Sequence, residues 1–245
     1  MHTPGLENEP AFIPLHAPPV LRWLERPAAI DLDLDAQTEA CWSRRCAANP
    51  RLHDAPIVGV LAFDDASITG VAETYRRLAV ADEVPTGVTA LGVTGVLHRT
   101  DPTGAHEILF ARRSAATRLY ARCWETAPRG GMPLRLPLTI ATLLDQLDQE
   151  LLEELGPNTV TPSSAWRVLG LVHDPFARSL DVVFARGVDD NDGPKAAAGW
   201  EYDALCWLTP EQALATEGKV ERLLSPPCRS LLRALMRDIA PRWWE

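Results

Sequence analysis

Residues 123–132 read CWETAPRGGM, and residues 143–156 read LLDQLDQELLEELG. Leucines in the second segment recur at intervals of three and four residues, which places them on one face of an α-helix: Leu144, Leu147, Leu151 and Leu155. The pair Gly156-Pro157 then ends the pattern. The segment therefore predicts an amphipathic helix that packs its leucine face against a core.

The same helix carries three glutamates on a different face: Glu150, Glu153 and Glu154. Side chains three and four residues apart on a helix are neighbours, so these like charges repel one another. A hard divalent cation such as Mg²⁺ would offset this repulsion, because it binds carboxylate oxygens. Taken alone, the three glutamates also fit a simple solvated face.

The segment before the helix contains Gly130-Gly131, a glycine pair that allows close approach of backbone to a ligand. Together with the helix, this pair resembles the Nudix box, in which a Gly-Gly element is followed by a helix with the pattern R-E-U-x-E-E-x-G-U, where U is a bulky apolar residue. The matching residues, 149–157, read QELLEELGP. The resemblance implies a Nudix hydrolase in which Glu150, Glu153 and Glu154 hold divalent metal ions and the glycine pair lies at the substrate.

Three positions depart from the family pattern. Gln149 stands at the position of the Arg, Pro157 at that of the final apolar residue, and Ala141 at that of an upstream Glu. In the family, that Glu and the Arg form a structural ion pair. Because both are absent here, neither leaves a buried charge without its partner. The three metal-binding glutamates are thus retained without this brace.

Composition bounds the class of protein. With 245 residues, 46% hydrophobic residues and 23% charged residues, the chain matches a soluble globular protein with one well-buried domain and an extension, or with two small domains. A formal net charge of -9 argues against nucleic acid as a partner, since nucleic-acid backbones are bound by basic surfaces. A small phosphorylated substrate remains compatible, because metal ions can bridge it to acidic side chains.

The cysteines and the first residues predict a location. The five cysteines include no C-x-x-C pair, which is typical of a reducing compartment. The opening MHTPGLENEP lacks a basic and apolar leader, and no stretch approaches the length of a membrane span. We expect a cytoplasmic protein with no membrane partner.

Residues 1–87 are expected to form a small α/β N-terminal unit. Prolines punctuate residues 1–30 and predict irregular chain. A helix from Asp35 through Cys46, a buried strand over 57–63 and a second helix over 68–78 follow from the apolar patterns.

This unit carries a second resemblance. The pattern Trp42, Arg45, Pro50, Leu52, Asp54-Ala55-Pro56, followed by Tyr75-Arg76, is similar to the leader of the Nudix branch that hydrolyses UDP-glucose and UDP-galactose. It implies a UDP-sugar substrate. The alternative is that the leader only covers an exposed face or edge of a sheet.

Residues 88–245 are expected to form the Nudix domain. Strands are predicted over 88–99, 108–111, 166–173, 180–185 and 205–208, with a short helix from Pro210. A terminal helix over 228–239 should turn four side chains inward: Leu231, Leu232, Leu235 and Met236. The fold class is therefore α/β, a mixed sheet in an α/β/α sandwich.

Further candidates lie outside the box. The resemblance implies substrate contacts at the end of the second strand, where Arg113 is the preferred phosphate contact and Arg112 fits a solvated strand end equally well. It also implies a catalytic carboxylate late in the chain, for which Glu201 is the first choice and Asp174 the second. The acidic run Asp189, Asp190 and Asp192 fits a solvated loop.

The predicted activity is hydrolysis of the diphosphate bond in a nucleoside diphosphate linked to another group. The favoured substrate is a UDP-sugar, giving UMP and sugar 1-phosphate, with Mg²⁺ as cofactor and Mn²⁺ as a substitute. One of the box glutamates or Glu201 would take the proton of the attacking water. The alternative is a non-catalytic regulator that binds a nucleotide or sugar nucleotide, and diphosphate isomerisation ranks last. A homodimer is compatible with either function.

Overall fold

The computed structural model describes residues 9–25, 32–156, 164–189, 200–215 and 223–239. The elements follow in the order β1 (Ala11–Pro14), β2 (Val20–Trp23), α1 (Leu32–Ala48), β3 (Pro56–Phe63), β4 (Ser67–Thr74), α2 (Tyr75–Ala79), β5 (Ala90–Thr100), β6 (His106–Arg113), β7 (Trp124–Thr126), β8 (Arg129–Gly131), α3 (Ile140–Leu155), β9 (Arg167–Asp174), β10 (Ser179–Gly187), β11 (Tyr202–Leu208), α4 (Pro210–Ala215), α5 (Pro226–Ala234) and a π-helical segment, η1 (Leu235–Ile239).

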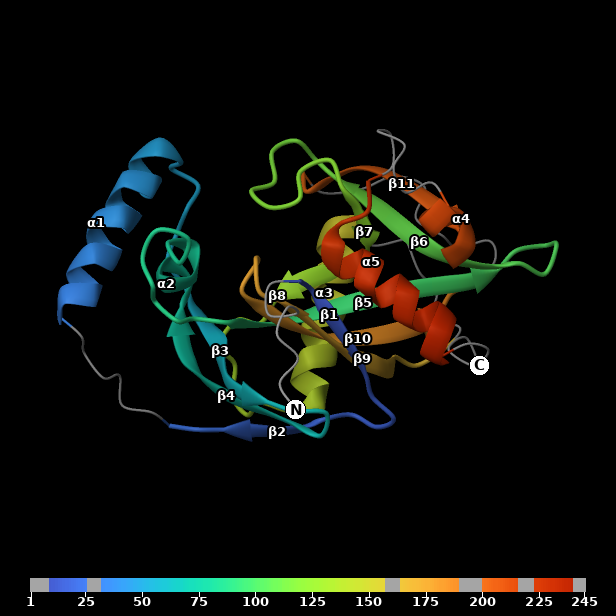
Figure 1. The fold of residues 1–245 in the computed structure, drawn as a ribbon, viewed down its shortest axis with the longest axis horizontal. Helices are drawn as coiled ribbons and strands as arrows, with labels where there is room; N and C mark the ends of the chain where they lie inside the picture. Colours follow the sequence, from blue (N-terminus) through green and yellow to red (C-terminus); the bar gives the residue numbers. More distant parts are fainter. Residues whose placement is uncertain (1–8, 26–31, 157–163, 190–199, 216–222, 240–245) are drawn as a thin grey trace.

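The strands form one mixed sheet (Figure 1). Its main path runs β1-β9-β10-β5-β3-β4-β2, and β6 leaves β5 to pair with β11 and β7. The pairs β10–β5 and β2–β4 are parallel, whereas the other pairs are antiparallel. The predicted α/β class with a mixed sheet is confirmed.

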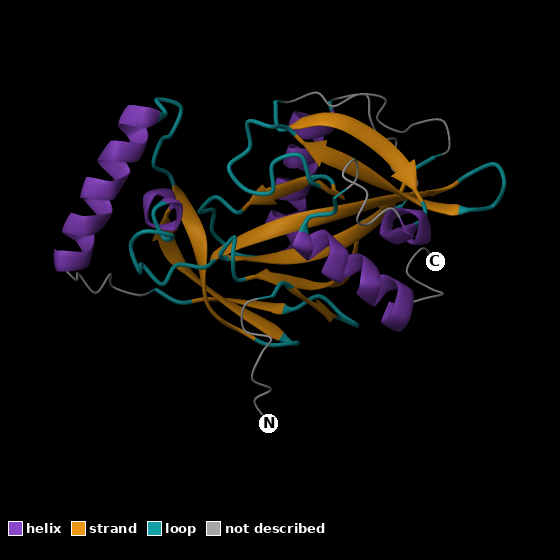
Figure 2. Cartoon of the chain, turned by 45° about the horizontal axis from the view of Figure 1, so that its top comes forward, coloured by secondary structure: helices purple, strands orange, loops and turns teal. Residues whose placement is uncertain are grey.

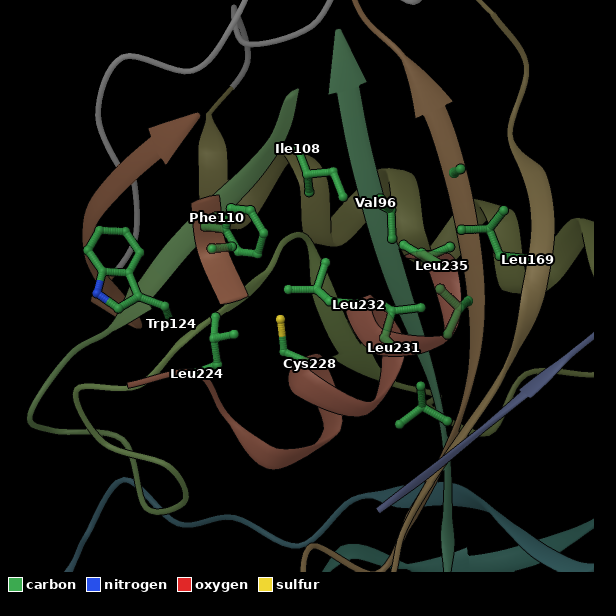
Figure 3. Packing of buried hydrophobic residues seen from close by; sticks show 14 residues of the cluster. Val96, Ile108, Phe110, Trp124, Leu169, Leu224, Cys228, Leu231, Leu232 and Leu235 are labelled. Atoms are coloured by element: carbon green, nitrogen blue, oxygen red, sulfur yellow. The ribbon is translucent and has the colours of Figure 1, made fainter. Parts of the chain in front are cut away.

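Helices cover both faces of the sheet. Neighbouring residues of a strand point to opposite faces, and in β10 Val182 packs in the cluster that contains Leu147 of α3, whereas Val183 packs with Leu231 of α5. Figure 3 shows the α5 side of this arrangement, with Leu231 and Leu232 directed toward the sheet. Figure 2 shows α3 and α5 separated by the strands. The result is three layers, helix, sheet and helix.

Helix α3 confirms the prediction from the leucine pattern. It begins after Thr139, whose hydroxyl accepts a hydrogen bond from the backbone N–H of Thr142, while the Thr142 side chain bonds back to the backbone N–H of Thr139. On the predicted face, Leu147, Leu151 and Leu155 are buried, and Leu144 is partly buried. The three glutamates of the helix lie outside this leucine face.

The N-terminal unit continues the sheet. Strand β3 pairs with β5 at Gly59 and Ala90, and the backbone N–H of Val58 donates to the carbonyl of Met132 at 3.0 Å. Helices α1 and α2 lie at the outer end of the molecule (Figure 1). The boundary near residue 87 falls between α2 and β5, and the division into units 1–87 and 88–245 stays a prediction.

The helix predicted over residues 68–78 is wrong. Residues 67–74 form strand β4, and only residues 75–79 are helical. Four positions in this segment favour a strand: Ile68, Thr69, Val71 and Thr74 are β-branched, while Gly70 weakens a helix. Ile68 and Val71 are both buried, on opposite faces of this strand, which adds to the preference.

The irregular chain predicted for residues 1–30 is corrected in part. Strand β1 pairs antiparallel with β9, and β2 pairs parallel with β4. Both are edge strands of the sheet. An edge strand tolerates proline because one of its sides has no neighbouring strand to hydrogen-bond, and β1 ends at Pro14. Residues 1–8 and 26–30 lie outside the described residues, and α1 begins at Leu32, before the predicted Asp35.

The terminal helix is also corrected. It starts at Pro226 and changes to a π-helical turn at Leu235. A π-helical turn rotates the residues that follow it, because its hydrogen bonds span one residue more than those of an α-helix. Leu231, Leu232 and Leu235 are buried as predicted, but Met236 is exposed. Within the described ranges, no helix has the length and apolar character needed to cross a membrane.

Candidate active site

A cavity of about 370 Å³ lies where the N-terminal unit meets the second half of the chain. It is bounded by β3 and α2 on one side and by β5, β8 and α3 on another, while the loop over residues 114–122 supplies a third side. Its lining residues are Ile57, Tyr75, Leu78, Ala90, Leu91, Gly92, Arg113, Arg118, Leu119, Tyr120, Arg129, Gly130, Gly131, Met132, Glu150, Ala177, Ser179, Asp181 and Glu201. A cavity of this size is typical of sites for small molecules.

Five of the eight predicted site residues line this cavity, although they come from four separate segments: Arg113, Gly130, Gly131, Glu150 and Glu201. Glu154 lies beside them, because its Oε2 accepts a hydrogen bond of 3.0 Å from the backbone N–H of Arg129.

Two predicted residues lie elsewhere. Glu153 is exposed and accepts a hydrogen bond from Gln149. Arg112 pairs with Asp203 at 2.5 Å and lies over the ring of Trp124. Neither lines the cavity.

Gly130 makes room for Glu150. A Cβ atom on residue 130 would lie 1.9 Å from Glu150 Oε1, so the carboxylate occupies the space of a side chain. Gln146, one turn earlier on α3, donates a hydrogen bond of 2.6 Å to the same oxygen. The glycine and the glutamine together fix the position of the Glu150 carboxylate.

We expect Gly130→Ala to displace the Glu150 side chain from Cγ outward while leaving the fold intact, because a Cβ at residue 130 meets only this side chain among its nearest atoms, with Cγ at 2.5 Å and Cδ at 2.1 Å. Activity in the assays below should fall, and the urea midpoint of unfolding should change little. Gly131→Ala is the matched comparison, since a Cβ there meets no atom within 4 Å. Equal activity losses in the two variants would contradict this explanation of Gly130.

The cavity carboxyls are crowded and shielded from water. Burial raises the pKa of Glu150 to about 7, with the Gln146 hydrogen bond acting against it and the charges of Glu153 and Glu201 adding to it. Burial also raises the pKa of Glu154 well above its usual value and that of Glu201 to a lesser degree. Removal from water and mutual repulsion thus oppose ionisation at all three positions.

An ion-pair network lies beneath these carboxyls. Arg129 Nε lies 2.7 Å from Asp181 Oδ2 and its Nη1 lies 3.5 Å from Glu125 Oε2, while Arg113 Nη1 lies 2.5 Å from Glu125 Oε1. The hydroxyl groups of Thr94 and Tyr202 donate to Asp181 and Glu125, respectively. Asp181 and Glu125 are each 2% exposed, so the arginines compensate charges that would otherwise be buried alone.

Sequence reasoning missed this network. The sequence did contain one indication of it, the aspartate Asp181 inside the apolar strand sequence LDVVF. A charged side chain within a buried strand requires a partner of opposite charge or a hydrogen bond. Arg129, directly before the glycine pair, was the available cation.

None of the other acidic candidates that the structure describes is among the residues that line the cavity. Asp174 is fully buried, and it accepts hydrogen bonds from the Tyr120 hydroxyl and from the backbone N–H groups of Phe176 and Ala177. These hydrogen bonds hold the turn between β9 and β10. Asp189 is exposed, and Asp190 and Asp192 lie outside the described residues.

The carboxyl groups of Glu150 and Glu154 are candidate ligands for a divalent cation. In the described ranges, no three His, Cys, Asp or Glu side chains are arranged as a set of metal ligands. The chemistry of Glu150 and Glu154 nevertheless fits a hard cation: both offer carboxylate oxygens one helical turn apart, and Glu154 Oε1 is buried without a hydrogen-bond partner. Both residues could therefore hold Mg²⁺ beside the cavity.

Comparison with known proteins gives matches only among solved structures; no family model and no curated protein matches the chain. The Nudix domain of Shewanella oneidensis NrtR, complexed with ADP ribose, is 15% identical with a TM-score of 0.44, covering 65% of this chain and 96% of that one. The MutT protein from Methanosarcina mazei Go1 is 18% identical with a TM-score of 0.44, covering 62% and 96%. A Nudix hydrolase from Alicyclobacillus acidocaldarius is 15% identical with a TM-score of 0.44, covering 60% and 90%. At these identities and TM-scores, the likenesses assign no activity, substrate or partner to this chain.

Proposed function

We propose that the protein is a Nudix-type, Mg²⁺-dependent hydrolase of the diphosphate bond in a nucleoside diphosphate linked to a second group. The observation that carries this proposal is one cavity lined by both carboxylates and arginines. Glu150 and Glu201 line it together with three arginines: Arg113, Arg118 and Arg129. A diphosphate needs cationic partners for its oxygens and carboxylates for a metal ion and a proton, and this cavity offers each.

The residues of the cavity have separable tasks in such a reaction. Arginine guanidinium groups hold phosphate oxygens through charge-assisted hydrogen bonds, and the backbone at Gly130 and Gly131 permits close approach of the ligand. Glu150 and Glu154 would hold Mg²⁺, with the exposed Glu153 added by the Nudix resemblance. When bound there, Mg²⁺ would neutralise diphosphate charge and would lower the pKa of a water that attacks the phosphorus.

Glu201 is the proposed general base. It lines the cavity, and its backbone carbonyl accepts a hydrogen bond of 2.7 Å from Ser114, which ties it to the loop beside Arg113. Burial raises its pKa, which brings the carboxylate closer to the value suited for taking a proton at neutral pH.

A UDP-sugar is the favoured substrate class, because the N-terminal unit that resembles the leader of UDP-sugar hydrolases also lines the cavity through Tyr75. Water would add to one phosphorus atom and the diphosphate bridge would break, giving UMP and sugar 1-phosphate. The cytoplasmic location and the homodimer stay predictions.

A second candidate is a regulator that binds the same ligand without cleaving it. The observation in its favour is at Gln149, where the arginine of the box is absent: Gln149 is exposed, and Arg135 donates to its Oε1 at 3.1 Å. Ala141 is exposed as well, so the usual brace of the catalytic helix has no counterpart at these two positions.

The test is product detection on UDP-glucose, UDP-galactose, ADP-ribose, dinucleoside polyphosphates, NADH and coenzyme A. We expect turnover of a UDP-sugar with Mg²⁺ or Mn²⁺ and none with excess chelator, with UMP and sugar 1-phosphate as products. Turnover of another compound would retain the hydrolase and reject the UDP-sugar. Thermal stabilisation by one compound without any product would contradict the hydrolase and support the regulator.

A further inference from the structure

Two of the three cavity arginines are already used inside the protein. Arg113 pairs with Glu125 and also donates from Nε to the carbonyl of Leu119 at 2.9 Å. Arg129 pairs with Asp181. Each of these two arginines already meets a buried carboxylate, so it can offer N–H donors to a ligand but little uncompensated positive charge.

Arg118 differs from both. Its side chain is exposed at the cavity, and within the described residues it makes no hydrogen bond or ion pair. Burial acts to raise the pKa of Asp82, but the hydrogen bond from Arg45 outweighs it, and the pKa is lowered. The charge of Arg118 lowers this pKa further by a smaller amount. Since Asp82 is held by Arg45 at 2.7 Å, the charge of Arg118 stays available.

The loop that carries Arg118 is anchored on both sides of it. The buried Thr117 donates from Oγ1 to the carbonyl of Ser114 at 2.9 Å, and the carbonyl of Leu119 accepts from Arg113. The hydroxyl of Tyr120 donates to the fully buried Asp174 at 2.8 Å. These bonds hold the backbone of the loop so that Arg118 lines the cavity.

One wall of the cavity is apolar and comes from the N-terminal unit. It consists of Ile57 of β3 and of Tyr75 and Leu78 of α2. The ring of Tyr75 packs edge-on against Trp42 of α1, with centroids 6.2 Å apart and planes at 84°. A ring fixed in this way offers a stacking and packing surface for a planar group.

We infer that Arg118 and this wall form the binding site for the nucleotide end of the substrate. Arg118 binds phosphate oxygens, and Tyr75 and Leu78 contact the base. This inference rests on the proposed function, because it assigns one end of the same substrate. It also gives the N-terminal unit a role in ligand selection, in place of a covering role alone.

Calorimetric titration with UDP, with ADP and with inorganic pyrophosphate tests the site, in excess chelator so that no turnover occurs. Arg118→Met should weaken the binding of all three probes by about tenfold or more, since a charge-assisted hydrogen bond is lost. Tyr75→Leu should weaken UDP or ADP and leave pyrophosphate unchanged. Arg118→Lys should recover part of the affinity, because it restores the charge without the planar fork.

Arg44→Met is the matched control, because it removes an arginine from an exposed ion pair with Glu83 away from the cavity. It should bind all three probes as the wild type does. Equal affinities of Arg118→Met and wild type would overturn the inference, as would a wild-type protein that binds none of the probes. An equal loss of pyrophosphate binding in Tyr75→Leu would overturn the assignment of the base to the apolar wall.

The outcome separates this inference from the proposed hydrolysis. The expected binding pattern without metal-dependent turnover would reject the hydrolase and keep the nucleotide site. In an active enzyme, Arg118→Met should raise KM by about tenfold or more with little change in kcat, because the contact exists before the chemical step. An unchanged KM would reject the role of Arg118 and keep the hydrolase.

Discussion

Glu154→Gln should remove metal-dependent turnover and leave the fold as stable as that of the wild type. Glu154 is only 4% exposed, and burial raises its pKa well above the usual value. Glutamine has nearly the same shape and retains an oxygen that can accept from the backbone N–H of Arg129. The substitution therefore removes a carboxylate whose ionisation is opposed by burial, without opening a cavity.

The loss of activity should be on the order of 100-fold or more, because the proposed metal site loses one of its carboxylate charges. Initial rates at saturating Mg²⁺, measured beside urea unfolding curves, give the two quantities to compare. Asp145→Asn is the control on the same helix, since Asp145 is exposed and does not line the cavity. Turnover by Glu154→Gln at the rate of the wild type would exclude Glu154 from the metal site.

Arg129→Met should have the largest effect on stability. The side chain of Arg129 is 16% exposed, and although burial opposes its charge, the carboxylates of Asp181 and Glu125 raise its pKa. Methionine leaves Asp181 with the Thr94 hydroxyl but without its cation. Loss of one member of a buried ion pair costs about 3–5 kcal/mol of unfolding free energy.

A double substitution separates this charge effect from lost packing. Arg129→Met with Asp181→Asn should recover a large part of the stability, because no unpaired charge then remains at Asp181. The exposed pair of Arg44 with Glu83 supplies the comparison, and its loss in Arg44→Met should cost about 0–1 kcal/mol. A cost for Arg129→Met no greater than that for Arg44→Met in urea unfolding would contradict the central role of the network.

The sequence was most informative where local pattern and packing agree. The leucine spacing of α3 predicts both the helix and its buried face, and the strands β3, β5 and β9 follow from continuous apolar runs. The box resemblance also directs attention to the right part of the chain, since Gly130 and Glu150 meet at the cavity.

The rest depends on contacts between distant segments. Strand β1 exists because β9 accepts it at the sheet edge, although its own residues are punctuated by proline. The choice of Arg113 as the preferred phosphate contact could not take account of Glu125, which pairs with Arg113 in the folded protein. No pattern in the sequence marks Arg118, because its proposed role follows from its place at the cavity and from the lack of an ion-pair partner among the described residues.

The pairing of β1 has a consequence for the order of events during synthesis. Residues 11–14 are translated before their strand partner β9, and the backbone N–H of Phe12 donates to the side chain of Ser230 on α5. Contacts between such distant residues form late, because a long segment must first be confined. Strand β1 can therefore dock fully only after β9 and the segment around Ser230 have been translated, and this sheet edge stays open until then.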